Sequence, residues 1–254
     1  MARVSVLVQS HERPEGLRRA LLSLQMQSYR DFEVVVSDDS AQGGEIRAVL
    51  DGPAAAGLDL RVAFTPPCGA AESMREAFGR ARGEVVKILH DDDWLTPHSL
   101  ACQVAALDHH ADANAVYGQA LISYPHGDRL YACFGEQALK VESAQWVARY
   151  AHDGMGPIQS PVTALYRRHT GFRVMWDEFR DPRLREAARK TGAGTDVSLQ
   201  VDNAASNRFV VLLPYVVCVL GTDMGSTTQV DPGIPEYYRR WKAEYDTHPP
   251  WRRT

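Results

Sequence analysis

Short apolar runs alternate with amphipathic stretches along the first half of the chain. A short apolar run bounded by polar residues predicts a buried strand, whereas apolar residues at i, i+3, i+4 and i+7 predict a helix. Leu17, Leu21 and Leu24 recur at helical spacing. The pattern predicts strands at residues 4–8, 33–37, 60–64 and 85–89, and helices over 14–24, 70–81 and 97–107.

Two prolines mark where helices are expected to begin. Pro14 suits a first helical turn, where its missing N–H loses no hydrogen bond. Thr96 followed by Pro97 has the form of an N-cap and a first helical residue. The alternation of strands and helices predicts an α/β fold, in which helices cover both faces of a parallel sheet.

The second half of the chain is less regular. Strands are expected at 115–123 and 129–133, joined by a turn at 125–128, and at 163–166. Helices are expected from Ser143 and over 182–190 and 196–206. Because no change in composition marks a boundary, we expect one domain made of two halves, residues 1–113 and 114–254.

Composition narrows the classes of function. A length of 254 residues suits one large domain, and a formal net charge of -4 argues against a dominant nucleic-acid surface. The apolar stretches at 4–8 and 209–220 are too short to span a membrane, which predicts a soluble cytoplasmic protein. The four cysteines form no CxxC pair and are interpreted as buried free thiols.

Acidic residues follow two of the predicted strands. Asp38 and Asp39 follow one strand, and Asp91, Asp92 and Asp93 follow another. The carboxyl ends of parallel strands meet at one edge of a sheet, so the two clusters could share a crevice. Adjacent carboxylates repel one another, and a divalent cation with oxygen ligands relieves that repulsion. The alternative is a solvated turn in which an aspartate caps the next helix.

Four segments resemble, in order, the motifs of family 2 glycosyltransferases. Residues 4–14 (VSVLVQSHERP) are similar to the family's opening strand, and residues 23–40 resemble its SLLxQTYxDFEVVVVDDGS segment. Residues 69–84 resemble GxSAARNxALxxAxGE, and residues 86–97, with HDDDWLTP, resemble the metal-binding DxD segment. The resemblance implies a GT-A fold, a mostly parallel Rossmann-like sheet whose first half binds a nucleotide sugar and whose second half binds an acceptor.

The resemblance also implies roles for residues of the first half. Ser10, His11 and Asp38 stand where the family holds the nucleobase. Arg75 stands where Asn is common, so it could contact a phosphate or the base, or be a surface charge. Asp91 is expected near the ribose or a metal-bound water.

A divalent cation, Mn²⁺ or Mg²⁺, is the cofactor that the resemblance implies. The common motif is Asp-x-Asp-Asp, which places Asp92 at the metal-binding carboxylate and His90 in place of the first aspartate. Asp92 is therefore the expected metal ligand, with His90 as second choice. Asp93 is expected to support the loop or to cap the next helix.

A base for the acceptor hydroxyl is expected in the second half. Asp196 follows the glycine-containing stretch 191–194, at the start of a predicted helix whose dipole favours a carboxylate. It matches the place of the family's catalytic acid pair, although it could be a plain N-cap. Asp153, Asp177 and Asp202 are rivals.

The sequence therefore predicts an inverting, metal-dependent glycosyltransferase. Its donor would be a nucleoside-diphosphate sugar, with a UDP-sugar favoured, and its acceptor a hydroxyl group of unknown origin. One alternative is a non-catalytic module that binds sugar nucleotides. Another is a GT-A-like nucleotidyltransferase, but those enzymes usually carry a glycine-rich loop after the first strand, and residues 9–14 contain no glycine.

Overall fold

The computed structural model describes most of the chain up to Gly221 and a few residues beyond it. The described residues are 2–131, 135–152, 160–168, 172, 174, 179–191, 195, 199–200, 203, 208–222, 236–237, 239–240 and 243. Their strands are β1 Val4–Ser10, β2 Phe32–Asp38, β3 Leu60–Phe64, β4 Val85–His90, β5 Trp94–Leu95, β6 Ala113–Ser123, β7 Arg129–Tyr131, β8 Leu139–Glu142, β9 Ala164–Arg167 and β10 Phe209–Gly221. Their helices are α1 Pro14–Gln25, α2 Gly44–Leu50, α3 Ala70–Arg80, α4 Ser99–His109, α5 Ser143–His152 and α6 Pro182–Thr191, with short 3₁₀ turns η1 Pro53–Ala55 and η2 Pro161–Thr163.

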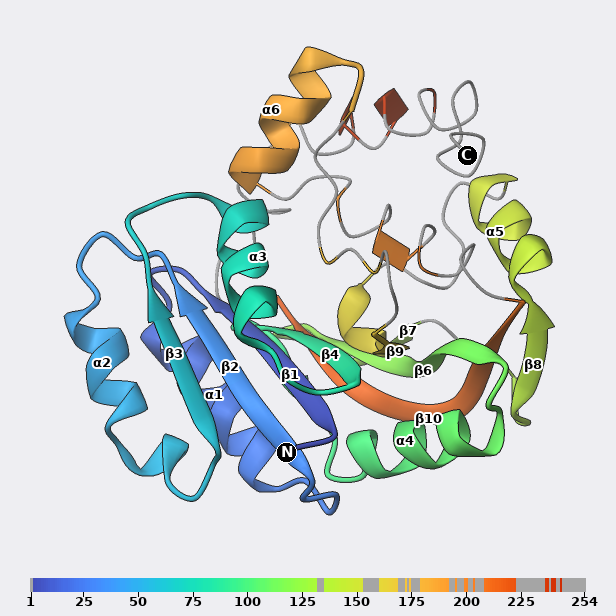
Figure 1. Ribbon diagram of the computed structural model, residues 1–254, viewed down its shortest axis with the longest axis horizontal. Coiled ribbons are helices and arrows are strands. Elements are labelled where there is room, and N and C mark those ends of the chain that lie inside the picture. Colours follow the sequence, from blue (N-terminus) through green and yellow to red (C-terminus); the bar gives the residue numbers. More distant parts are fainter. Residues whose placement is uncertain are drawn as a thin grey trace.

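All the described strands belong to one sheet. Its order is β3-β2-β1-β4-β9-β6-β10-β5, and β7 and β8 pair with β6 and β10 (Figure 1). Strands β1 to β4 run parallel, and β9 lies antiparallel between β4 and β6. The chain leaves β1 toward β2 and β3 on one side and later returns to place β4 on the other side. The strand order therefore reverses between β1 and β4, where α/β sheets bind ligands.

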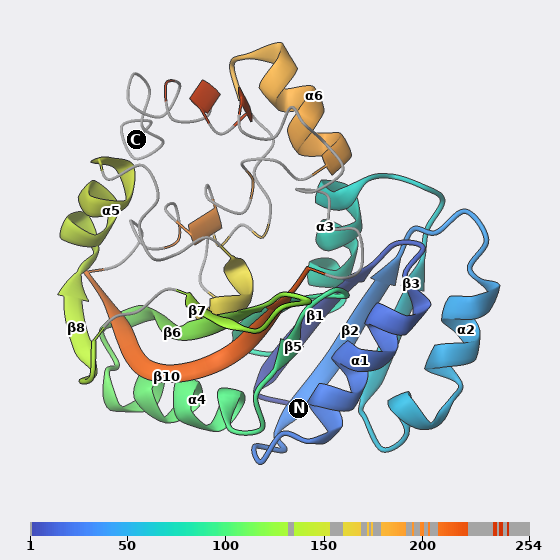
Figure 2. The ribbon, with the colours of Figure 1, turned by 180° about the vertical axis from the view of Figure 1, so that it is seen from behind.

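Helices cover both faces of this sheet. Helices α3, α5 and α6 lie over one face in Figure 1, while α1 and α2 lie in front of the other face in Figure 2. Successive side chains of a strand point to opposite faces of the sheet, so alternate residues of the central strands belong to the two hydrophobic cores. In β1, Leu7 belongs to the core under α3, whereas Val6 and Val8 pack on the side of α1.

The predicted elements of the first half are confirmed, with shifted ends. The helix start predicted at Thr96 and Pro97 is wrong, because α4 begins at Ser99 and its N-cap is His98. Thr96 instead pairs with β10: its Oγ1 donates to the Val216 carbonyl at 2.8 Å. The hydroxyl that suggested a cap therefore anchors a distant strand.

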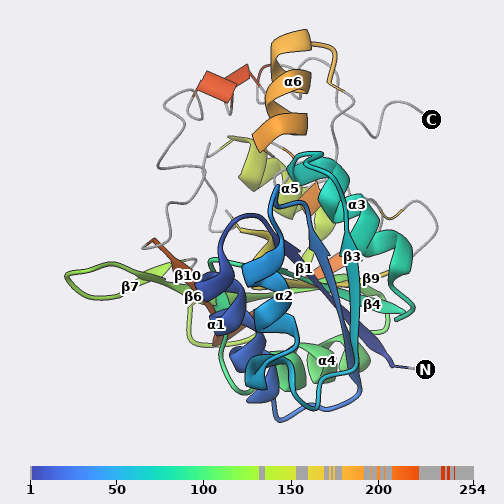
Figure 3. The same cartoon turned by 90° about the vertical axis from the view of Figure 1, so that its left-hand side faces the viewer.

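The long apolar stretch of the second half is a strand. β10 pairs parallel with β6 across its whole length and antiparallel with β5 and β8. Pro214 falls inside the stretch where the register between β10 and β6 shifts, and an irregular ladder tolerates a missing N–H. Figure 3 shows the hairpin of β6 and β7 extending away from the other described elements.

A buried lysine links three elements at the centre of the fold. Lys87 of β4 is fully buried, and its Nζ donates to Gln103 Oε1 at 2.8 Å and to the Val162 carbonyl at 2.6 Å. β4, α4 and η2 are thereby joined. Burial lowers the pKa of Lys87 to about 8, because a low-dielectric interior disfavours the charged form.

None of the described helices combines the length and the apolar character needed to cross a membrane.

Candidate functional site

The candidate site lies at the carboxyl ends of β1, β2 and β4. Ser10 pairs with Asp38 in the ladder between β1 and β2, and Gln9 pairs with His90 between β1 and β4. This register brings the loops that follow the three strands to one edge of the sheet. The two acidic clusters are therefore neighbours, as the sequence predicts.

The cluster after β2 is buried and tied to its surroundings. Asp38 is 1% exposed, accepts a hydrogen bond from Ser40 Oγ at 2.7 Å, and has its pKa raised by burial. Asp39 Oδ1 lies 2.9 Å from His11 Nδ1, and its Oδ2 accepts the Gly69 N–H at 2.9 Å. Asp39 therefore fixes the loop after β1 against the N-terminus of α3.

The Arg13 guanidinium forms ion pairs with two residues of the acidic triplet, which is Asp91, Asp92 and Asp93. Its Nη2 lies 2.7 Å from Asp91 Oδ1 and its Nη1 lies 2.9 Å from Asp92 Oδ2. Arg13 is the N-cap residue of α1, so the first turn of that helix carries the counter-charge. The Asp91 side chain is 1% exposed and also accepts the His11 N–H at 3.1 Å. Burial raises the pKa of Asp91 to about 7, reinforced by the charge of Asp92 and opposed by Arg13.

The triplet is held by α1 and by the end of β10. The Gly221 N–H donates to Asp93 Oδ1 at 2.9 Å. Arg19 Nη2 donates to the Asp92 carbonyl at 2.9 Å, and its guanidinium stacks 4.1 Å from the centre of the Trp94 ring. These contacts join the loop to α1 and to β10.

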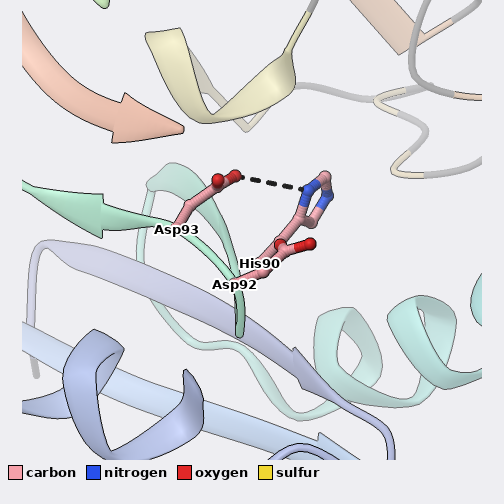
Figure 4. Close-up of side chains that lie close together, drawn as sticks. All are labelled: His90, Asp92 and Asp93. Carbon is pink, nitrogen blue, oxygen red and sulfur yellow. Dashed lines mark ion pairs between the residues drawn. The ribbon is translucent and has the colours of Figure 1, made fainter. Parts of the chain in front are cut away.

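His90, Asp92 and Asp93 form a group that could hold a metal ion. One ligand atom from each lies within 4.8 Å of the others (Figure 4). The side chains of His90 and Asp93 point toward one another, with Nδ1 and Oδ2 3.7 Å apart. Burial lowers the pKa of His90, whereas burial and the charge of Asp92 raise the pKa of Asp93 well above its ordinary value.

Most of the residues predicted for the donor side meet here. Ser10, His11, Asp38, Asp91 and Asp92 all lie on the loops and strand ends at this edge. Arg75 lies on α3, whose N-cap Gly69 is bound by Asp39, and its Nη1 pairs with Glu72 at 2.7 Å. Asp196 and its rivals Asp153, Asp177 and Asp202 lie outside the described residues.

Sequence reasoning missed the residues that hold the triplet in place. Arg13 had a visible signal, because a basic residue after the first strand faces the acidic residues after its neighbour in the sheet. Arg19 and Gly221 had none, because their roles depend on contacts over 73 and 128 residues of chain.

The fold is shared with crystal structures of S. aureus TarS. One of them gives a TM-score of 0.68 at 20% identity and covers 97% of this chain and 40% of that chain. TarS 1-349 in complex with UDP-GlcNAc gives 0.71 at 19% identity, covering 95% and 66%. The complex with UDP gives 0.67 at 19% identity, covering 95% and 64%. The chain thus spans less than two thirds of the length of each of these structures, and identity this low shows the fold alone. No curated protein matches the sequence.

The match to a protein family is more specific. Residues 5–168 fit the model of a family described as glycosyl transferase family 2. The matched segment contains both acidic clusters, Arg13 and strands β2 to β9, and it covers more than half of the chain. Together with the mostly parallel sheet and the shared fold, it confirms the predicted GT-A class. The chain belongs to glycosyl transferase family 2.

Proposed function

We propose that the chain is an enzyme that transfers a sugar from a nucleoside-diphosphate sugar to an acceptor hydroxyl. The observation that carries this proposal is the meeting of two acidic clusters where the strand order reverses. Membership of the family supports glycosyl transfer as the reaction. Residues 1–113 would form the donor half and residues 114–254 the acceptor half.

The nucleotide would lie over the ends of β1 and β2. A buried carboxylate such as Asp38 can accept a base N–H, and Ser10 lies beside it in the ladder. His11 would shape this pocket rather than move freely, because its ring contacts Asp39 and its N–H contacts Asp91. We favour a UDP-sugar, since TarS, which has the same fold, was solved in complex with UDP and with UDP-GlcNAc.

A divalent cation, Mn²⁺ or Mg²⁺, would bind at the acidic triplet. The donor set fits, because carboxylate oxygens are ligands that both ions accept. Asp92 is the proposed main ligand, since its side chain is 13% exposed whereas that of Asp91 is 1% exposed. Bound there, a cation would act as a Lewis acid toward the charge on the leaving diphosphate.

Asp91 would hold the loops of the site in place rather than contact the ribose. Its carboxylate is occupied by Arg13 and by the His11 N–H, so it holds the loops after β1 and β4 together. Arg75 remains the candidate contact for a phosphate, because its helix begins at the loop bound by Asp39. It would have to exchange its pairing with Glu72 for that contact.

Asp196 is the proposed base for the acceptor hydroxyl. Its place in the sequence supports the proposal, since it follows a glycine-containing stretch and matches the family's acidic motif. The carboxylate would accept the hydroxyl proton while the oxygen attacks the anomeric carbon opposite the leaving group. Such a displacement inverts the anomeric configuration.

A panel of UDP-, GDP- and TDP-sugars tests the proposal. A donor present at 100 times its Kd should stabilise the folded chain by about 2.7 kcal/mol. The same donor concentration should stabilise the chain less when EDTA replaces Mn²⁺. Asp92→Asn should remove the dependence on metal. Asp112→Asn is the matched control, because Asp112 is an exposed acid paired with Lys140. Slow hydrolysis of the bound donor, followed by NMR, should release the inverted sugar. Binding without turnover would favour the non-catalytic module, and no binding by any donor would refute the proposal.

A further inference from the structure

We propose that the His90 imidazole is a direct ligand of the cation, and that the site consequently prefers Mn²⁺ to Mg²⁺. This inference rests on the proposed function, which places a divalent cation at the acidic triplet. It identifies a further side chain that binds the cation and the ion that the site prefers. The structure supports it through the position of His90, the atoms left facing the cluster, and the chemistry of the donor set.

His90 ends β4 and is held at the edge of the cluster by its backbone. The ladder with β1 fixes its register opposite Gln9, and its carbonyl accepts the Asp93 N–H at 3.1 Å. The tight turn from His90 to Asp93 folds the two side chains toward each other (Figure 4). Their Nδ1 and Oδ2 atoms are 3.7 Å apart, and two ligands bound at about 2.1 Å from one ion lie at most about 4.2 Å apart.

The protein already occupies one oxygen of each neighbouring carboxylate. Asp93 Oδ1 accepts the Gly221 N–H, so its Oδ2 is the oxygen directed at His90. Asp92 Oδ2 accepts from Arg13 Nη1. Since the atoms of the three residues lie within 4.8 Å of one another, a small side-chain adjustment brings them to one ion.

A site with one nitrogen ligand discriminates between cations. Carboxylate oxygens bind Mg²⁺ and Mn²⁺ alike, but imidazole suits first-row transition ions better than Mg²⁺, which prefers oxygen and retains its waters. An aspartate at position 90 would make the group all-oxygen and acceptable to both ions. His90 therefore changes the selectivity of the site without removing its capacity to bind metal.

Electron paramagnetic resonance on the full chain tests the ligand directly. Mn²⁺ is added alone and then with UDP, to protein labelled with ¹⁴N-histidine or ¹⁵N-histidine. A directly bound imidazole should give a nitrogen coupling in the electron spin echo that changes with the isotope. The coupling should disappear in His90→Asp and persist in His126→Asp, which makes the same exchange at an exposed residue between β6 and β7. Because the isotope test uses the unmodified chain, it does not depend on how well His90→Asp folds.

Competition between the ions tests the selectivity. Mg²⁺ should displace Mn²⁺ poorly from the unmodified chain, and His90→Asp should lower the ratio of Mn²⁺ to Mg²⁺ affinity by roughly tenfold or more, because the nitrogen ligand is lost. Absence of an isotope-sensitive coupling, or a ratio unchanged by His90→Asp, would overturn the inference. The proposed function fails separately. If UDP leaves the Mn²⁺ spectrum unchanged, the donor class is wrong even where the coupling to His90 is present.

Discussion

Gly221 lies so close to Asp92 that a Cβ on the glycine would stand 2.1 Å from the Asp92 carbonyl oxygen. No side chain fits at that distance, so the end of β10 and the acidic loop pack backbone against backbone. Gly221→Ala must push the loop away and break the hydrogen bond from the Gly221 N–H to Asp93. We expect weaker binding of Mn²⁺ together with UDP, measured by calorimetry.

Gly79→Ala is the control for that change. Gly79 lies inside α3, and a Cβ there meets nothing within 4 Å. Alanine has a higher helix propensity than glycine, so this variant should be at least as stable as the unmodified chain and bind Mn²⁺ normally. If Gly221→Ala binds Mn²⁺ and UDP as tightly as Gly79→Ala does, the close approach has no role in the site.

Arg13→Gln should destabilise the chain and make its stability depend on metal more strongly than that of the unmodified chain. The change leaves Asp91 and Asp92 without the guanidinium that neutralises them. An unpaired buried group costs about 1–3 kcal/mol, and a bound cation should restore part of that loss. Urea unfolding with and without Mn²⁺ measures both effects. Arg18→Gln, which breaks an exposed pair with Glu15 on the same helix, should match the unmodified chain in both measurements, and an equal response of the two variants would contradict the prediction.

Lys87 should make stability depend on pH above neutrality. Its folded pKa is about 8, below the ordinary 10.5, so between these values the unfolded chain binds more protons than the folded one. Stability attributable to Lys87 therefore rises with pH across that window, by at most about 3 kcal/mol, and is lost as pH falls toward 8. The unfolding free energy of the unmodified chain, minus that of Lys87→Met, should increase from pH 8 to 10.5. A constant difference would show that the lysine is not neutralised by burial.

Asp38→Ala should weaken nucleotide binding without affecting metal binding. Removing a buried acceptor that pairs with a base N–H costs about 1–3 kcal/mol of affinity. Because Asp38 contacts Ser40 and not the acidic triplet, Mn²⁺ alone should bind as before. Titration with UDP and with Mn²⁺ separates the two. An unchanged Kd for UDP in a folded variant would show that Asp38 does not contact the nucleobase.

Asp196→Asn should separate chemistry from donor binding. A positioned base contributes about 10²–10⁴-fold to the rate, so transfer should fall by that factor while donor and metal affinities stay nearly unchanged. Asp92→Asn should instead impair metal-dependent donor binding. Transfer at the original rate would move attention to Asp202 or Asp177, and loss of donor binding would show that Asp196 lies on the donor side.

The sequence was most informative where structure is local. β1, β2 and β4 follow from runs of buried β-branched residues, and their acidic ends follow from the rule that parallel strands share an edge. The start of α4 was wrong because the Thr96 hydroxyl bonds to β10, a partner that local pattern does not reveal. The contacts of Arg19 and Gly221 escaped prediction for the same reason, since each joins segments far apart in the chain.

The order of β10 in the chain has a consequence for biosynthesis. The wall of the acidic loop is formed by a glycine that leaves the ribosome 128 residues after Asp93. Until then β5 lacks its partner strand, and β6 lacks the strand that pairs with its far edge. The nascent protein would therefore carry its complete metal motif well before it could use it. In newly made chains the acidic loop would therefore be completed late, when β10 joins the sheet.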